Sequence, residues 1–281
     1  MEHIILATDG SPNAEAALDH AIVLADRMDA TVHGVYSVYL RPNADYGIKE
    51  DLGTVRTAEE KSGEGALDTV ETRCEQAGVE VETELRSGPA PKEIEQVAND
   101  VDADLIVMGT QGGGGLRGLL LGSTTVGVLR RVDRPVLAIP RGAPAPSKGY
   151  EDILIATDAS ERAEQAADVA FDWAEAFGAA VHGLFVVDPN FARAEEVEEA
   201  LGKRGKRALE ELESRATDRG IEFTWEIEAG IPHERINEYG EENDLDLIVV
   251  GSHGRSGVER SFLGSVSERT LRTTDHPILI V

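Results

Sequence analysis

Two loops of this sequence share a spacing of glycine and hydroxyl residues that is suited to holding a phosphate. The pattern Gly-x₂-Gly-x₉-Gly-Ser occurs twice without a gap, within 109–125 and 251–267. Glycines let a backbone approach a phosphate and adopt positive φ, a helix that opens at Gly-Ser offers free N–H groups to an anion, and hydroxyls add donors. An ordinary capped helix after a flexible loop is the alternative, which the repeated spacing disfavours. The predicted binding residues of these loops are Gly109, Gly112, Gly122, Ser123 and Thr125 in the first and Gly251, His253, Gly254, Gly264, Ser265 and Ser267 in the second.

An aspartate follows the first apolar segment of each half of the chain. Asp9 comes after Ile4-Ile5-Leu6-Ala7-Thr8, and Asp158 comes after the matching Ile153-Leu154-Ile155-Ala156-Thr157. A carboxylate at this place can accept hydrogen bonds from a base or a ribose. The alternative is an Asx turn that leads into the next helix. We expect a binding role, because both positions face the crevice that the phosphate loops border.

Other sequence motifs for nucleotide binding, catalysis and metal binding are either absent from the sequence or found in the wrong context. The chain has no G-x₄-G-K-[ST] motif and no G-x-S-x-G motif. The segment 113–118 matches G-x-G-x-x-G by letter, but it follows the fourth strand and has no equivalent in the second half. The seven histidines lack metal-ligand spacing. We therefore predict no catalytic residues and no metal ligands.

These residues are positioned by a duplicated unit. The segment 3–11 recurs as 152–160, an offset of 149 residues, whereas the segment 104–109 recurs as 246–251, an offset of 142. The first copy therefore has about seven extra residues, most simply within 39–51. A segment rich in proline, glycine and serine separates the copies. The predicted organisation is a first domain at 1–142, a linker at 143–150 and a second domain at 151–281.

Short apolar segments alternate with helical patterns in both copies. This alternation predicts an α/β fold with a parallel sheet and right-handed crossovers in each copy. The ligand crevice of such a sheet lies beyond the carboxyl ends of its strands, where the strand order reverses. In the first copy the expected strands are 3–8, 31–38, 79–86, 104–109 and 135–139, and the expected helices are 12–29, 55–77, 89–101 and 123–131.

The composition excludes several classes of partner. The chain of 281 residues carries 53 acidic and 27 basic side chains, with 24 acidic against 13 basic in 1–142 and 29 against 14 in 143–281. A field of this sign repels nucleic acid and anionic membranes, and no apolar run approaches the roughly 20 residues of a membrane span. A first strand at the start of the chain and a single cysteine predict a cytoplasmic protein. Only six of the basic residues are lysine, and this combination of many acidic residues with few lysines favours a halophilic protein over an ordinary acidic one.

The repeated loop, the Ile-Leu-x-Ala-Thr-Asp strand and the final Pro-Val-Leu strand together resemble the universal stress protein family in its tandem form. The segment 251–267 is close to the typical motif sequence of that family. In the first copy, Gln111, Gly113 and Thr124 stand at the positions of His253, Arg255 and Val266. The resemblance covers nearly the whole chain. It implies two Rossmann-like open sandwiches, each with a five-stranded parallel sheet of order 3-2-1-4-5 and helices on both faces.

The resemblance also implies membership of the ATP-binding branch. The two aspartates would then meet the adenine or the ribose, and the backbone at Ser37 and Val186 would flank the base. The expected ligand is ATP, ADP or AMP, with or without Mg²⁺. The last strands, 135–139 and 277–281, would pair the copies as a pseudo-dimer, and a homodimer and an unidentified protein partner are further expectations.

We therefore expect a stress or regulatory protein in which nucleotide occupancy changes shape or assembly. The alternatives are a weak ATP-hydrolysing enzyme and a protein-interaction scaffold with an empty pocket. Loss of the charge of Arg255 from the first copy predicts that the two sites differ in affinity.

Overall fold

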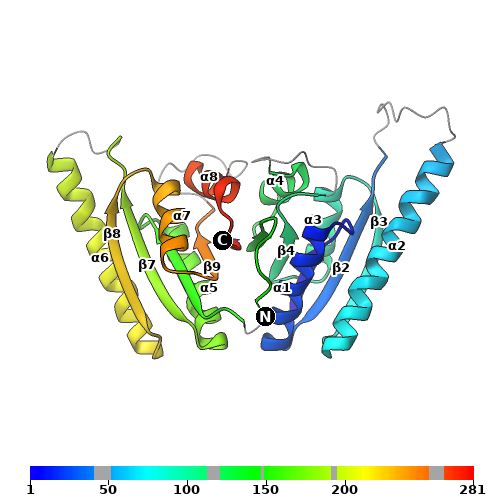
Figure 1. The fold of residues 1–281 in the computed structure, drawn as a ribbon, viewed down its shortest axis with the longest axis horizontal. Helices are drawn as coiled ribbons and strands as arrows, with labels where there is room; N and C mark the ends of the chain where they lie inside the picture. The colour runs from blue at the N-terminus through cyan, green and yellow to red at the C-terminus, as the bar shows by residue number, and fades with distance from the viewer. Residues whose placement is uncertain (41–51, 113–120, 147–148, 191–194, 253–262) are drawn as a thin grey trace. The chain divides into compact units, whose positions relative to one another are not determined.

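The chain folds into two compact α/β units, Met1–Ala145 and Pro146–Val281, which we describe separately (Figure 1). The computed structural model describes residues 1–40, 52–112, 121–146, 149–190, 195–252 and 263–281. His253 and Gly254 of the second predicted phosphate loop lie outside the described residues, as do Gly113, Arg255 and most of the segment to which the extra residues of the first copy were assigned.

The first unit is a five-stranded parallel sheet with strand order β3-β2-β1-β4-β5. This is the 3-2-1-4-5 order that the resemblance implies, and it places β1 beside β4. The elements are β1 (His3–Ala7), α1 (Pro12–Met28), β2 (Thr31–Val38), α2 (Leu52–Ala77), β3 (Val81–Ser87), α3 (Ala90–Asp100), β4 (Leu105–Gly109), α4 (Ser123–Leu129) and β5 (Val136–Ile139).

The second unit repeats this arrangement with all of its strand pairs parallel. Its strand order is β8-β7-β6-β9-β10, so that β6 and β9 occupy the places of β1 and β4. The elements are β6 (Asp152–Thr157), α5 (Glu161–Phe177), β7 (Ala180–Val187), α6 (Glu195–Arg219), β8 (Phe223–Ala229), α7 (Pro232–Glu242), β9 (Leu247–Val250), α8 (Ser265–Thr273) and β10 (Ile278–Ile280).

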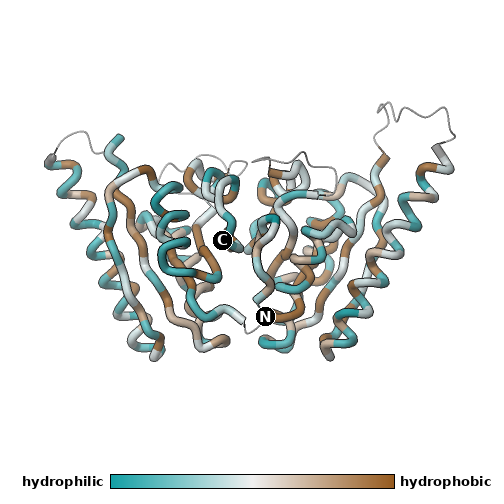
Figure 2. The backbone as a smooth tube through the Cα atoms, in the orientation of Figure 1, coloured by the Kyte–Doolittle hydropathy of each residue, from teal (hydrophilic) through white to brown (hydrophobic). Residues whose placement is uncertain are grey.

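Helices cover both faces of each sheet. In the first unit α1 contacts α2, and α3 contacts α4. Side chains on one face of the strands, among them Ile5 and Met108, pack with Ile94 of α3 and Val128 of α4. On the other face Tyr36 and Val38 pack with Leu67 of α2. The central strands are therefore apolar throughout, which is visible as brown strands in Figure 2.

Local sequence signals account for the ends of several helices. Ser11 caps α1, since its hydroxyl accepts a hydrogen bond from the N–H of Ala14 at 3.3 Å, and Pro12 occupies the first helical position. Gly78 and Gly220 follow α2 and α6 with φ of +76° and +72°, the left-handed conformation predicted for them. These residues thus define where α1 begins and where α2 and α6 end.

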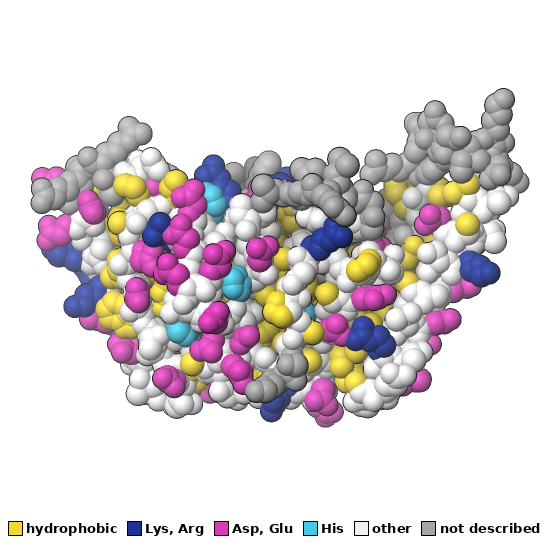
Figure 3. All heavy atoms as spheres, viewed as in Figure 1, with side chains coloured by type: hydrophobic (Ala, Val, Ile, Leu, Met, Phe, Trp, Pro, Cys, Tyr) yellow, Lys and Arg dark blue, Asp and Glu magenta, His cyan; other side chains and the backbone are white. Residues whose placement is uncertain are grey.

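The surface is acidic on the face shown in Figure 3, where Asp and Glu side chains are spread over both units. The formal net charge of −26 is therefore not confined to one segment. Among the described residues, no helix combines the length and the apolar character that crossing a bilayer requires.

Candidate functional site

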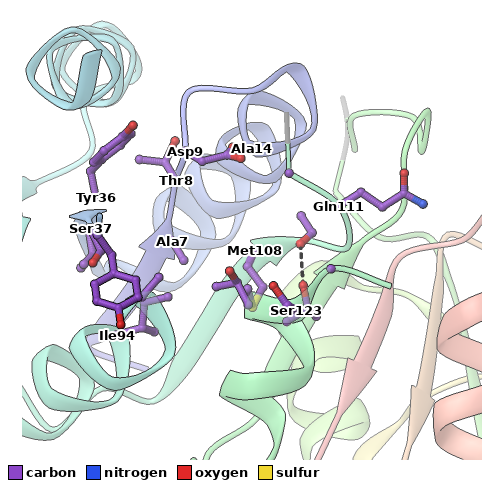
Figure 4. Close-up of a pocket in the computed structure, with 18 of the residues that line it drawn as sticks. Ala7, Thr8, Asp9, Ala14, Tyr36, Ser37, Ile94, Met108, Gln111 and Ser123 are labelled. Carbon is purple, nitrogen blue, oxygen red and sulfur yellow. Dashed lines mark hydrogen bonds between the residues drawn. The ribbon is translucent and has the colours of Figure 1, made fainter. Parts of the chain in front are cut away.

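A pocket of about 640 Å³ lies at the carboxyl edge of the first sheet, where β1 and β4 end side by side. The crevice predicted from the strand order is thus present, and all seven predicted binding residues of the first copy line it. Figure 4 shows Tyr36 and Ser37 at one end of the pocket and Gln111 and Ser123 at the other. The lining residues are Ala7, Thr8, Asp9, Ala14, Val35, Tyr36, Ser37, Tyr39, Glu59, Ala90, Ile94, Met108, Gly109, Gln111, Gly112, Leu121, Gly122, Ser123, Thr124 and Thr125.

Asp9 holds the turn after β1 and also faces the pocket. Its Oδ1 accepts a hydrogen bond from the N–H of Ser11 at 3.1 Å, which is the Asx turn considered as the alternative. Its Oδ2 is directed at Gly112, where an added methyl group would lie 2.5 Å away. Asp158 makes the same turn in the second unit, with Ser160 as the donor at 3.0 Å. In both units the Asx turn uses Oδ1 of the aspartate as the acceptor.

The predicted phosphate loop is closed at its base in both units. The N–H of Gly122 donates to the carbonyl of Thr110 at 2.7 Å, and the N–H of Gly264 donates to the carbonyl of Ser252 at 2.7 Å. The residue before α4 or α8 is therefore hydrogen-bonded to the residue that follows Gly109 or Gly251. Gly122 and Ser123 line the pocket, so the first N–H groups of α4, which have no acceptor within the helix, lie at this edge of the sheet.

The hydroxyls of Thr125 and Ser267 are hydrogen-bonded to the backbone. Both side chains are buried, and each donates to the carbonyl at the end of the preceding strand: Thr125 to Gly109 at 3.1 Å and Ser267 to Gly251 at 2.6 Å. A hydroxyl has one proton, and in this structure it is used in these bonds, so donation to phosphate stays a prediction for both groups. These bonds tie α4 and α8 to β4 and β9. The exposed side chains of Ser123 and Ser265 remain free of this constraint.

The conformation predicted for the glycines needs correction. Gly109, Gly112, Gly122 and Gly251 are absent from the residues with positive φ. Gly109 is required by close packing, because an added methyl group would lie 2.4 Å from the side-chain nitrogen of Asn13. In the second unit a methyl group on Gly251 would lie 3.0–3.1 Å from backbone atoms at the start of α5. Gly109 and Gly251 therefore admit the first turn of a neighbouring helix, and the approach of a phosphate to the loop glycines stays a prediction.

Asn13 supports the loop without lining the pocket, and sequence reasoning missed it. It is 7% exposed, and its amide group donates to the carbonyls of Gln111 and Ile139 at 3.0 and 3.3 Å. It therefore links α1, the phosphate loop and the end of β5. The repeat could not reveal it, because the second copy has Arg162 at this position.

The end of the pocket opposite α4 is formed by β2, α2 and α3. Ser37 lines it, and its hydroxyl donates to the carbonyl of Gly88 at 2.6 Å. Val186 occupies the matching place in β7, one residue before the strand ends. Burial raises the pKa of Tyr36, and the carboxylates of Glu59 and Asp9 raise it further. Tyr36, Tyr39 and Glu59 were not predicted as site residues.

The Thr125 bond gives a first test of this geometry. Replacing Thr125 with valine keeps the shape of the side chain but leaves the Gly109 carbonyl without its hydroxyl donor. We expect the free energy of unfolding to fall by about 1–2 kcal/mol, because a buried acceptor loses its partner. Urea denaturation measures this change. Thr57→Val is the matched control, since that hydroxyl donates to a carbonyl on the exposed side of α2; equal losses in both variants would contradict the assignment.

The chain is similar to known proteins over its whole length. The model of the universal stress protein family matches residues 1–140 and again 149–281. A universal stress protein of Methanocaldococcus jannaschii is 35% identical over 139 residues, which cover 47% of this chain and 82% of the relative. One from Mycolicibacterium smegmatis is 28% identical over 99% of this chain and 96% of its own length. The crystal structure of a universal stress protein from Archaeoglobus fulgidus superposes with a TM-score of 0.77 at 23% identity, covering 99% of this chain and 97% of that one.

Proposed function

Because this chain belongs to the universal stress protein family, we propose that it is a stress-response protein whose two units each bind an adenine nucleotide. Nucleotide occupancy would alter the conformation or assembly of the chain. The observation that carries this proposal is the pocket of the first unit, which joins an apolar and aromatic end to a closed loop before a helix N-terminus. Its volume is in the range of small-ligand sites.

The chemistry of the two ends supports one orientation of the nucleotide. Val35, Ile94 and Tyr39 form an apolar end suited to a base. The N–H groups at the start of α4, with Ser123, form an end suited to phosphates. Asp9 lies between them and is suited to accept hydrogen bonds from a ribose or a base. Any Mg²⁺ would enter with the nucleotide, bound through its phosphate oxygens.

The lining of the pocket favours binding over rapid hydrolysis. None of the described residues that line it is lysine, arginine or histidine. Sites that transfer phosphoryl groups place cations against the migrating charge. We therefore propose a nucleotide-dependent switch, with slow hydrolysis of ATP as the alternative function. The pairing of the two units, a homodimer and a protein partner stay predictions that rest on the resemblance.

Release of bound nucleotide tests the proposal. The purified protein is denatured by heat, and the supernatant is analysed for nucleotides by chromatography and mass spectrometry. We expect adenine nucleotide to be released. Incubation of the native protein with ATP and Mg²⁺ then separates the two functions, since a switch leaves ATP intact over many binding cycles. Absence of adenine nucleotide together with failure to bind added ATP would refute both.

We also propose that the acidic surface is an adaptation to high salt. With a formal net charge of −26, self-repulsion opposes the folded state, and salt screens it because the Debye length falls from about 10 Å at 0.1 M to about 3 Å at 1 M. We expect the melting temperature to rise with KCl, by about 2–4 °C for each kcal/mol of repulsion removed. Scanning calorimetry from 0.1 to 2 M KCl measures this effect. A melting temperature that is constant or falls over this range would contradict the adaptation.

A further inference from the structure

We propose that Asn13 is a positioning residue for the first site: it fixes the backbone of the phosphate loop against α1 and β5, and it thereby sets how much the phosphates of a nucleotide add to its affinity. The proposal rests on the nucleotide binding proposed above. It adds a residue that neither the repeated glycine and serine pattern nor the aspartate after β1 includes. It concerns the first unit, because the second carries Arg162 at this position.

The amide nitrogen of Asn13 joins three elements through two hydrogen bonds. Asn13 lies in the first turn of α1, and its Nδ2 donates to the carbonyl of Gln111 at 3.0 Å and to the carbonyl of Ile139 at 3.3 Å. Gln111 belongs to the loop that follows β4, and Ile139 is the last residue of β5. Both partners are acceptors, so the amide satisfies them only with its nitrogen turned toward them. The side chain therefore fixes the loop to two other elements of the sheet and its helices.

Close packing holds the Asn13 side chain in this position. The residue is 7% exposed, and a methyl group on Gly109 would lie 2.4 Å from its Nδ2 and 3.0 Å from its Cγ. The carbonyl of Ile139 also accepts from the N–H of Thr110 at 2.9 Å, and the carbonyl of Thr110 accepts from the N–H of Gly122 at 2.7 Å. Asn13 thus completes a set of bonds that holds residues 110 and 111 at the end of β5.

These residues border the end of the pocket that is suited to phosphates. Gln111 and Ser123 lie at the same end of the pocket, and Gly112 and Gly122 also line it (Figure 4). A loop that is already held in one conformation loses less conformational entropy when a ligand binds to it. The bond from Asn13 to Gln111 should therefore strengthen the binding of a phosphate group at this end.

The rest of the pocket is positioned independently of Asn13. Asp9 is held by its own turn, in which the N–H of Ser11 donates to its Oδ1 at 3.1 Å. The apolar end is formed by residues of β2 and α3, among them Val35 and Ile94. A nucleoside would use these groups and has no phosphate to place on the loop. Loss of the Asn13 amide should therefore weaken the binding of ATP but not the binding of adenosine.

The second unit brings helix and strand equally close with a different residue. A methyl group on Gly251 would lie 3.0–3.1 Å from backbone atoms of Arg162 and Ala163. The Nη1 of Arg162 donates to the side-chain oxygen of Gln165, on the same helix, at 3.1 Å. The close approach is therefore common to both units, whereas the amide bonds from the helix to the loop and to the last strand are a feature of Asn13.

Paired titrations with ATP and adenosine test the proposal. The full chain carries Gly264→Val in every sample so that the first unit dominates binding, and dissociation constants are measured by calorimetry in high salt with Mg²⁺. We expect the chain with Asn13 to bind ATP more tightly than adenosine. Asn13→Ala, which suits a helix, should weaken ATP binding by on the order of 10-fold and change adenosine binding by less than about 2-fold. Asn13→Asp should weaken ATP binding further, because a carboxylate only accepts and would face two carbonyls.

Asn243→Asp is the matched control. The Nδ2 of Asn243 donates to the carbonyl of Tyr239 at 2.9 Å, at the end of α7 in the second unit and outside the first pocket. This variant should leave both dissociation constants unchanged.

The comparison of the two ligands separates positioning from general support of the fold. Equal weakening of ATP and adenosine in the Asn13 variants, or unchanged binding of ATP, would overturn the proposal. A parent chain that binds adenosine as tightly as ATP would overturn the positioning role and leave an adenine site in place. Failure of both ligands to bind to the unsubstituted chain would overturn the proposed function itself.

Discussion

Replacing Gly122 with valine should remove nucleotide binding from the first unit and leave one bound nucleotide per chain. Gly122 lies at the junction of the loop and α4, and its N–H donates to the carbonyl of Thr110 at 2.7 Å. An added methyl group would lie 3.0 Å from that carbonyl oxygen, and the rest of the valine side chain would occupy the pocket wall. The backbone angles of φ −62° and ψ 141° suit valine, so the variant should still fold.

The measurement is the number of ATP molecules bound per chain at saturation, determined by equilibrium dialysis. Gly264→Val should have the same effect in the second unit, and the double variant should bind none. Gly65→Val is the matched control in the first unit, because an added methyl group there would meet nothing within 4 Å. Unchanged stoichiometry in both single variants, with intact circular dichroism spectra, would show that the two loops do not bind the nucleotide.

Acidification should destabilise the first unit through one buried histidine. His20 lies on α1 with 1% exposure, and burial lowers its pKa from 6.5 to about 4, against the opposing influence of Asp19 and of the Pro144 backbone. The unfolded chain therefore binds this proton more readily than the folded one. The contribution of neutral His20 to the free energy of unfolding is fully present above pH 6.5. It is lost as the pH falls toward 4, and the loss is about 3 kcal/mol for this shift of the pKa.

Urea denaturation between pH 4 and pH 7.5 in high salt measures this dependence. His20→Val, which introduces the residue that the second unit carries as Val169, should flatten the pH dependence between 6.5 and 4. His233→Gln, on α7 of the second unit, leaves His20 in place and should preserve the slope. A His20→Val variant with the same slope as the parent would mean that carboxylates alone account for the acid sensitivity.

The duplicated fold and the location of the pocket could be predicted from the sequence. The alternation of apolar segments and helices, the repeat and the resemblance together gave the strand order, and that order places β1 beside β4. Gly78 and Gly220 were predictable because a helix C-terminus favours glycine in the left-handed conformation. These features depend on local conformation and on the order of the elements. Both can be recognised in a sequence from the spacing of apolar residues, glycines and repeated segments.

The roles of individual side chains within the site could not be predicted in the same way. A glycine indicates that something comes close to the backbone but not what does so, and at Gly109 the neighbour is Asn13. The bond from the Thr125 hydroxyl to the Gly109 carbonyl could not be predicted, because these groups become adjacent only when α4 packs on β4. Glu59 enters the pocket from a helix that follows the segment in which the two copies differ in length, so the repeat gave no indication of it.

The stoichiometry of ATP binding tests directly whether both units bind a nucleotide. The full chain is unfolded, freed of nucleotide and refolded in high salt, and is then titrated with ATP in a calorimeter. We predict saturation at two ATP molecules per chain, with two affinities, because Tyr36 and Glu59 line the first pocket whereas Phe185 and Leu201 stand at the matching positions of the second unit. A correctly refolded chain that shows no heat of binding with ATP, ADP or AMP would contradict the central claim that these pockets bind adenine nucleotides.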